Sequence, residues 1–204
     1  MENNESVECL SPVEYDGFVY LMDKEIFYNA EGGNIKKRTR ILLNGEENSF
    51  NEMIIELIDD DDIYFVYRFQ INSNDFEEFK RSQELKIDFL NFPKKLDELL
   101  YLSMQDSKGV YIKIYLEDNQ IVLSFYQKLK LRDVVLFSLH LQPADQETVN
   151  SLIKYRFEKL QNLLFSQQRQ YEDILKSINE KNPSLSKKIR SAVEKRVDQY
   201  FNPN

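Results

Sequence analysis

The sequence has very few of the residues that build catalytic, redox or metal sites. It contains one cysteine, Cys9, one histidine, His140, and no tryptophan. A single cysteine excludes an internal disulfide and a cysteine-based zinc site. Because the one histidine and the one cysteine lie on separate segments, a Ser/His or Cys/His nucleophile system has little material. We therefore expect no enzymatic activity, no metal and no cofactor.

Glycine, proline and long apolar runs are also scarce. Only 5 Gly and 5 Pro occur among 204 residues, which argues against long flexible linkers. No segment approaches the roughly 18 apolar residues of a membrane helix. The first ten residues are polar and acidic, unlike a secretory signal. We therefore expect a soluble, intracellular chain with no membrane partner.

The charge is acidic and uneven. The formal net charge is −8, yet the stretch from Lys181 onward holds six basic and two acidic residues. An acidic body binds nucleic acid poorly because affinity for DNA depends on neutralising phosphates, so we expect no nucleic-acid partner. The basic end is interpreted first as a solvated helix end. Its positive charge would also allow it to bind an anionic surface. The acidic run Asp59–Asp62 is interpreted as a solvated turn, because it lacks the ligand spacing of a calcium loop.

The first 143 residues have the pattern of an antiparallel β protein. Segments rich in aromatic and β-branched residues are separated by turn signals such as Asn44-Gly45 and Asp118-Asn119. These segments span residues 17–29, 39–43, 53–58, 63–71, 110–117, 121–128 and 134–141. A hydrophobic fraction of 42% is enough for a packed core. We predict a head domain, residues 1–143, that is a seven-stranded β-sandwich or barrel with inserted short helices.

Two helices are predicted between the strands of this head. Ser73 or Asn74 is expected to cap the first helix, in which Phe76 and Phe79 share a face. A short strand is expected over 86–89. Asn91 is expected to cap the second helix, where Pro93 fits the first turn because its missing N–H needs no partner there. The predicted buried side of that helix consists of Leu96, Leu99, Leu100 and Met104.

From about Asp145 the pattern becomes helical with a heptad period. The seam residues are spaced alternately four and three apart, with Gln167 as the polar layer, and are Ile153, Phe157, Leu160, Leu164, Gln167, Tyr171, Ile174 and Ile178. Such spacing predicts a coiled-coil helix over 144–181 that pairs two chains, although a single helix folded back on the head would also fit. Asn182-Pro183 is expected to end it. A short basic helix or tail, capped by Ser184, follows over 182–204.

The stretch from Asp59 to Leu100 resembles the spindle assembly abnormal protein six family. Asp75-Phe76 matches the start of that family's capped helix. A Leu-x-Ile-Asp-Phe-x-x-Phe-Pro motif follows, in which Asp88, Phe89, Phe92 and Pro93 are the signature positions. The resemblance implies a head like that of the X-ray repair cross-complementing scaffold proteins, followed by a parallel coiled-coil dimer.

The resemblance also implies a function. Members of that family are structural proteins that homodimerise through the coil and oligomerise through the heads, as scaffolds of the centriole or basal-body cartwheel. The expected partners are further copies of the chain and other centriolar or microtubule-associated proteins. The expected location is the cytoskeleton of the cytoplasm, or apical structures for a coil-poor branch. Leu131 stands at the position of the family's head-to-head contact residue, usually Phe, with Leu129 beside it.

Two other functions stay open at this point. A microtubule-binding module would use the basic residues between Lys187 and Arg196. A DNA-repair scaffold of the same fold would need a coil that binds DNA or a ligase, and the acidic body argues against it.

Overall fold

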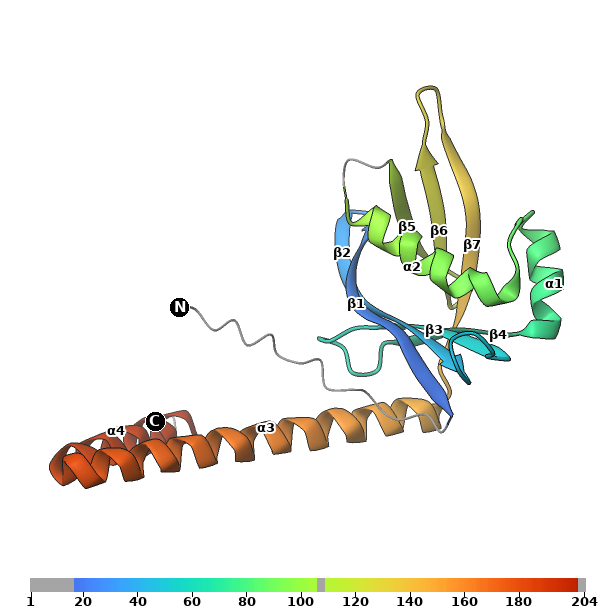
Figure 1. The fold of residues 1–204 in the computed structure, drawn as a ribbon. Helices are drawn as coiled ribbons and strands as arrows, with labels where there is room; N and C mark the ends of the chain where they lie inside the picture. The colour runs from blue at the N-terminus through green and yellow to red at the C-terminus, as the bar shows by residue number, and fades with distance from the viewer. Residues whose placement is uncertain (1–16, 106–108, 202–204) are drawn as a thin grey trace. The chain divides into compact units, whose positions relative to one another are not determined.

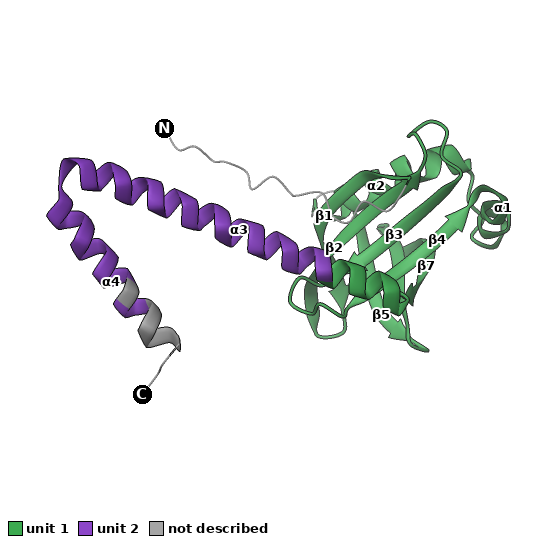
Figure 2. Cartoon of the chain, turned by 90° about the horizontal axis from the view of Figure 1, so that it is seen from below, with its two compact units in different colours: residues 1–153 green, residues 154–204 purple. Residues whose placement is uncertain are grey.

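The computed structural model describes residues 17–105 and 109–201 (Figure 1). Cys9 therefore lies outside the described residues. The chain divides into two compact units, Met1–Ile153 and Lys154–Asn204 (Figure 2), and each unit is treated by itself. Whether the functional domains divide at 143 and 181 stays a prediction.

Within the described residues, seven strands close into a barrel in the order β1-β2-β3-β4-β7-β6-β5. They are β1 (Phe18–Ala30), β2 (Gly33–Asn44), β3 (Glu52–Ile58), β4 (Val66–Asn72), β5 (Val110–Glu117), β6 (Gln120–Lys128) and β7 (Asp133–Pro143). Neighbouring strands are antiparallel except at the closing seam, where β1 and β5 meet in parallel at Asn29 and Lys113. The predicted class, a mainly antiparallel β head with inserted helices, is confirmed.

Short polar turns set the register of the hairpins. Asp118 and Asn119 both have positive φ, 47° and 66°, which is the conformation of a two-residue turn between twisted strands. The predicted fourth strand begins three residues too early, because the backbone from Asp59 to Phe65 forms a loop instead. In that loop the Asp59 carboxylate accepts a hydrogen bond from the Asp61 N–H, and the Asp62 carboxylate accepts one from the Tyr64 N–H.

The inserted helices differ from the prediction at their ends. The cap of α1 (Ser73–Ser82) is Asn72 rather than Ser73 or Asn74, because the Asn72 Oδ1 accepts hydrogen bonds from the N–H groups of Asn74 and Asp75. The strand predicted over 86–89 is absent. Phe89 instead begins the 3-10 turn η1 (Phe89–Asn91), in which the Asn91 N–H donates to the Asp88 carbonyl.

Helix α2 (Phe92–Ser103) holds Pro93 in its first turn, as predicted. Asn91 precedes the helix, but its side chain makes no capping hydrogen bond. Leu96 and Leu100 are buried and Leu99 is partly buried, whereas Met104 is exposed. The prediction for Met104 was wrong because the helix ends at Ser103 and turns the next side chain outward.

The barrel core is rich in aromatic rings. The Phe76 ring lies 5.2 Å from that of Phe92, and the Phe92 ring lies 5.9 Å from that of Phe137. Phe92 is 2% exposed, and Phe89 belongs to the same cluster, so the predicted burial of both residues is confirmed. Helices α1 and α2 are thereby fixed to the barrel by their aromatic faces.

Two helices follow the barrel, α3 (Gln146–Lys181) and α4 (Pro183–Phe201). The predicted end of the long helix before Asn182-Pro183 is confirmed. The cap of α4 is Asn182 rather than Ser184, because the Asn182 Oδ1 accepts a hydrogen bond from the Leu185 N–H. Among the described residues, no helix combines the length and the apolar character needed to cross a membrane.

Candidate assembly surfaces

The β6–β7 hairpin presents an apolar side chain to solvent. Leu131 is 98% exposed at its tip, and Leu129 beside it is also exposed. The hairpin extends beyond the rest of the barrel (Figure 1). Its connection is closed by a hydrogen bond from the Leu129 N–H to the Arg132 carbonyl, 3.1 Å. An apolar residue so fully exposed on a tight loop contributes nothing to the core of its own head.

The base of this hairpin is braced on the outer sheet face. The rings of Tyr111 and Tyr126 stack with centroids 5.0 Å apart, and the Lys128 ammonium lies 5.2 Å from the centre of the Tyr111 ring. The Tyr111 hydroxyl donates to the Asp133 carboxylate, 2.7 Å. Burial and this carboxylate together raise the pKa of Tyr111 to about 12. These contacts tie β5, β6 and β7 together at the base of the hairpin.

An apolar groove of about 600 Å³ lies between α2 and the sheet. Its volume falls in the range of about 300–1,000 Å³ that is typical of ligand pockets. The polar residues that line it are Glu84, Lys86, Lys95 and Gln127. The apolar lining includes Leu85, Ile87, Leu99, Leu102, Leu136 and Phe137. The head therefore carries both an exposed leucine and an apolar recess.

The signature residues shape one wall of this groove. Phe92 lines the groove and also packs in the core, while Phe89 and Pro93 are buried near it in sequence. The Asp88 side chain is exposed and lies 3.3 Å from the Lys80 ammonium. The backbone carbonyl of Asp88 accepts the N–H groups that start the turn into α2. The motif thus positions α2, which forms the groove.

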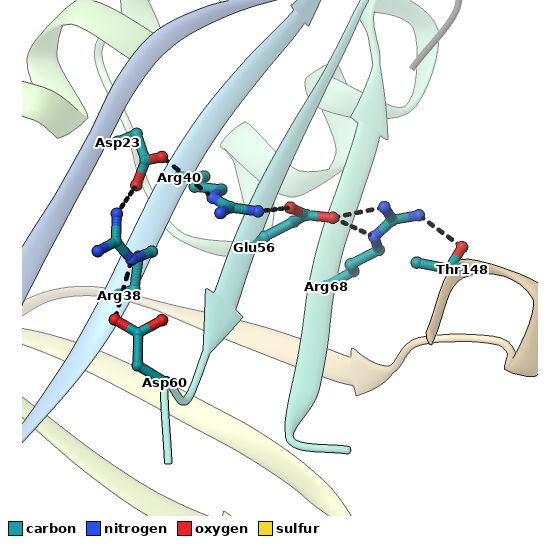
Figure 3. A network of polar contacts seen from close by, with 7 residues as sticks. All are labelled: Asp23, Arg38, Arg40, Glu56, Asp60, Arg68 and Thr148. Atoms are coloured by element: carbon teal, nitrogen blue, oxygen red, sulfur yellow. Dashed lines mark hydrogen bonds and ion pairs between the residues drawn. The ribbon is translucent and has the colours of Figure 1, made fainter. Parts of the chain in front are cut away.

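A chain of charged side chains crosses the outer face of strands β1 to β4 (Figure 3). Glu56 is 0% exposed and accepts a hydrogen bond of 2.7 Å from the Arg68 Nε, while the Arg40 guanidinium lies 3.7 Å away on its other side. Asp23 pairs with both Arg40 and Arg38 at 3.3 and 3.2 Å. Two arginines therefore compensate the buried carboxylate, as a charge in a low-dielectric site requires.

This polar chain ends on the first turn of α3. The Arg68 Nη1 donates to the Thr148 hydroxyl, 3.0 Å, and that hydroxyl donates to the Asp145 carboxylate, 3.0 Å. Asp145 caps the helix by accepting the Thr148 N–H at 2.8 Å. The hydrogen bonds from the Thr148 N–H and hydroxyl hold the pKa of Asp145 below its usual value. The start of α3 is therefore held by strand β4.

These hydrogen bonds and a second, smaller apolar cluster together form the joint between the barrel and the start of α3. Val149 and Leu152 pack on Ile58 and Val66, and Ile153 lies partly buried against them. Ile153, the first residue of the predicted seam, therefore contacts the barrel. The seam beyond the joint is largely uncovered in the single chain: Phe157, Leu160, Leu164 and Ile174 are exposed, Gln167 is exposed, and Tyr171 and Ile178 are partly buried.

Two aspartates of the acidic turn pair with basic side chains of strand β2. Asp59 pairs with Lys37, and Asp60 lies 3.2 Å from Arg38. Partial burial opposes ionisation of Asp59, but the bonds from Lys37 and two backbone N–H groups lower its pKa. His140 is exposed on the barrel exterior. No group of three His, Cys, Asp or Glu side chains suited to a metal occurs among the described residues.

A closed barrel with a projecting hairpin, continued by a heptad helix, defines a head-and-helix protein. Residues 20–141 match the family described as the centriolar protein SAS N-terminal domain, and the chain belongs to this family. The spindle assembly abnormal protein 6 homologs of Mus musculus and Danio rerio are 24% and 26% identical to it over 148 and 155 residues. Each match covers 68% of this chain and only 23% or 24% of the relative, so the chain spans about a quarter of those proteins.

Solved structures show the same fold. An N-terminal fragment of Leishmania SAS-6 containing parts of its coiled coil has a TM-score of 0.66 at 18% identity, covering 82% of this chain and 98% of the fragment. A Drosophila melanogaster Sas-6 fragment, described as dimerised via its coiled-coil domain, has a TM-score of 0.64 at 18% identity. The match covers 92% of this chain and 98% of the fragment. At such identity the likeness establishes the fold alone.

Three features of these surfaces were missed by reasoning from the sequence. The groove combines residues from the loop before α2, from α2 itself and from β5 to β7, and no local pattern reveals such a combination. The sequence did contain a signal for the buried Glu56, because it is the one charged residue in the apolar strand Met53–Ile58. The sequence contained no signal for the contact of α4 with Leu175 of α3, since Leu175 lies outside the heptad seam.

Proposed function

We propose that this chain is a structural protein that self-assembles into a scaffold of the centriole or basal body, in the cytoskeleton. Membership in the centriolar SAS family supports the cellular role. One chain pairs with a second through α3, and each head joins another head by inserting Leu131 into the apolar groove beside α2. The observation that carries the head contact is Leu131, 98% exposed on a braced hairpin, in a head that also has an apolar recess.

The proposed head contact is two-fold. Each head offers one leucine and one groove, so two heads bury two leucines in a symmetric arrangement. Burying one leucine is worth roughly 1.5–3 kcal/mol, and two give roughly 3–6 kcal/mol. The loss of rigid-body freedom opposes this gain, so the contact between isolated heads is weak. Pairing through α3 brings two heads together and makes assembly through them effective.

The experiment measures self-association of the full chain by sedimentation velocity in the background Leu160→Asp with Leu164→Asp, which removes pairing through α3. We expect a concentration-dependent head dimer that Leu131→Glu abolishes. Leu116→Glu is the matched control, because Leu116 is 65% exposed near the β5–β6 turn and lies outside the groove. Equal association of the Leu131 and Leu116 variants would refute the contact.

A complementation test assigns the leucine to the groove. Leu102→Glu places a charge in the groove lining, and we expect it to weaken the head contact as Leu131→Glu does. A mixture of the two variants restores one of the two insertions, so it should associate more strongly than either variant alone. A mixture no stronger than its components would show that Leu131 and the groove do not meet.

A second candidate function uses the charge of α4. Lys187, Lys188 and Arg190 are exposed, as are Lys195 and Arg196, which suits binding to the acidic surface of a microtubule. Co-sedimentation with microtubules tests this idea, comparing the wild type with Lys187→Glu and Lys188→Glu. Binding that is absent, or unchanged by the substitutions, would eliminate it.

A further inference from the structure

Unit 2 buries very little within one chain. Helices α3 and α4 meet near their connecting turn, where the Ser186 hydroxyl donates to the Leu175 carbonyl at 3.4 Å. Leu175 is 3% exposed and is the one apolar side chain fully buried among the described side chains beyond residue 153. Away from the turn the two helices separate (Figure 2). One buried leucine cannot offset the entropy of ordering two helices, so this unit needs another surface.

The uncovered apolar side chains lie on both helices. On α3 they are the seam residues Phe157, Leu160, Leu164 and Ile174. On α4, Leu185 and Val193 remain 45% and 38% exposed, although Leu185, Ile189 and Val193 form one helical stripe. A partner that covered α3 alone would leave the α4 stripe in water.

The position of α4 leaves room for such a partner. Glu172, Leu175 and Asn179 of α3 line a pocket together with residues of α4, and they follow one another at helical spacing on the flank of the seam. Ile174, on the seam itself, stays exposed. The occupant that fits is a second copy of this chain, because a heptad seam is complementary to itself and the α4 stripe lies in the same compact unit as the seam.

We propose that α4 forms part of the dimer interface, so that two α3–α4 hairpins pair as a four-helix bundle rather than as a two-stranded coil of α3 alone. This inference rests on the proposed pairing through α3. Four helices bury the stripes of both α3 and α4, as in other bundles whose core residues face inward from every helix.

Hydrogen exchange of the wild-type chain, measured below and above the dimer dissociation constant, tests the bundle directly. Amides of 157–178 and of 186–193 should both gain protection as the protein dimerises. If only the amides of 157–178 gain protection, the four-helix bundle is refuted while the pairing through α3 still holds. A chain that stays monomeric would overturn the pairing itself, so the two failures are distinguishable.

Substitutions on opposite faces of α4 provide the second test. Val193→Asp places a charge in the stripe, whereas Ser191→Asp places the same charge on the opposite, exposed face. Measured by sedimentation equilibrium, Val193→Asp should raise the dissociation constant at least tenfold, and Ser191→Asp should change it less than twofold. If Val193→Asp dimerises like the wild type, or if both variants weaken the dimer equally, α4 lies outside the interface.

Discussion

The barrel head and the α3–α4 unit differ in how they bury apolar side chains. The head encloses a continuous core of aliphatic and aromatic residues drawn from all seven strands and from α1, η1 and α2. The helical unit has an equally regular apolar pattern, yet among its described side chains only Leu175 and Ser186 are buried. The head therefore buries its apolar side chains within one chain, whereas the helical unit leaves most of its own exposed.

The largest effect of a substitution is therefore expected inside the head. Phe92→Ala should lower the free energy of unfolding by about 3–5 kcal/mol, because it empties a site in the aromatic core. Tyr101→Ala, on the exposed side of α2, is the control and should cost less than about 0.5 kcal/mol. Chemical denaturation of the full chain measures both. A loss below about 1 kcal/mol for Phe92→Ala would show that the core is not the source of the head's stability.

The second-largest effect of a substitution is expected at the joint between the barrel and the start of α3. Arg68→Met leaves the buried Glu56 with one arginine in place of two and removes a donor to Thr148. We expect a loss of about 3 kcal/mol in the free energy of unfolding, because a buried charge loses its closest partner.

Arg38→Met is the matched control for the joint. Arg38 belongs to the same polar chain but pairs with Asp23 and Asp60 at the more exposed end, so we expect less than about 1 kcal/mol. Equal losses for the two arginine variants would mean that the contact with α3 has no special role.

A smaller, stabilising effect is expected at the hairpin. Leu131→Phe should strengthen the head contact by roughly 1 kcal/mol per inserted ring, because the groove of about 600 Å³ has room for a larger side chain. Sedimentation velocity in the Leu160→Asp, Leu164→Asp background measures the change. Weaker association of Leu131→Phe would show that the groove fits leucine alone or that the ring goes elsewhere.

The smallest effect concerns pH at the helix start. The pKa of Asp145 lies below its ordinary value of 3.8, so its stabilising contribution is present above pH 3.8 and is lost as the pH falls through the lowered pKa. Thr148→Val removes the hydroxyl bond and should raise the pKa of Asp145 toward 3.8, which an NMR titration of the carboxyl carbon would show. An unchanged titration would refute the role of Thr148.

Local patterns predicted more of the head than of its surfaces. Alternation of apolar residues and the Asp118-Asn119 turn located most strands, and the aromatic spacing placed Phe89 and Phe92 in the core. Side-chain hydrogen bonds moved several boundaries, as at Asn72 and Asp62, because one carboxylate or amide decides where a helix or strand begins.

The groove and the joint depend on residues far apart in sequence. Arg68 and Thr148 are 80 residues apart and meet only after the barrel closes. A heptad pattern likewise indicates that α3 needs a partner, but the pattern contains no information on the fold-back of α4 onto Leu175.

The central claim is that the chain assembles through two separate surfaces, the Leu131 hairpin with its groove and the helical unit. Sedimentation velocity of the full chain from low to high micromolar concentration tests it most directly. We expect the wild type to form species larger than a dimer. Leu131→Glu alone, or Leu160→Asp with Leu164→Asp, should stop assembly at a dimer. A wild-type chain that stays monomeric or stops at a dimer at high micromolar concentration would contradict it.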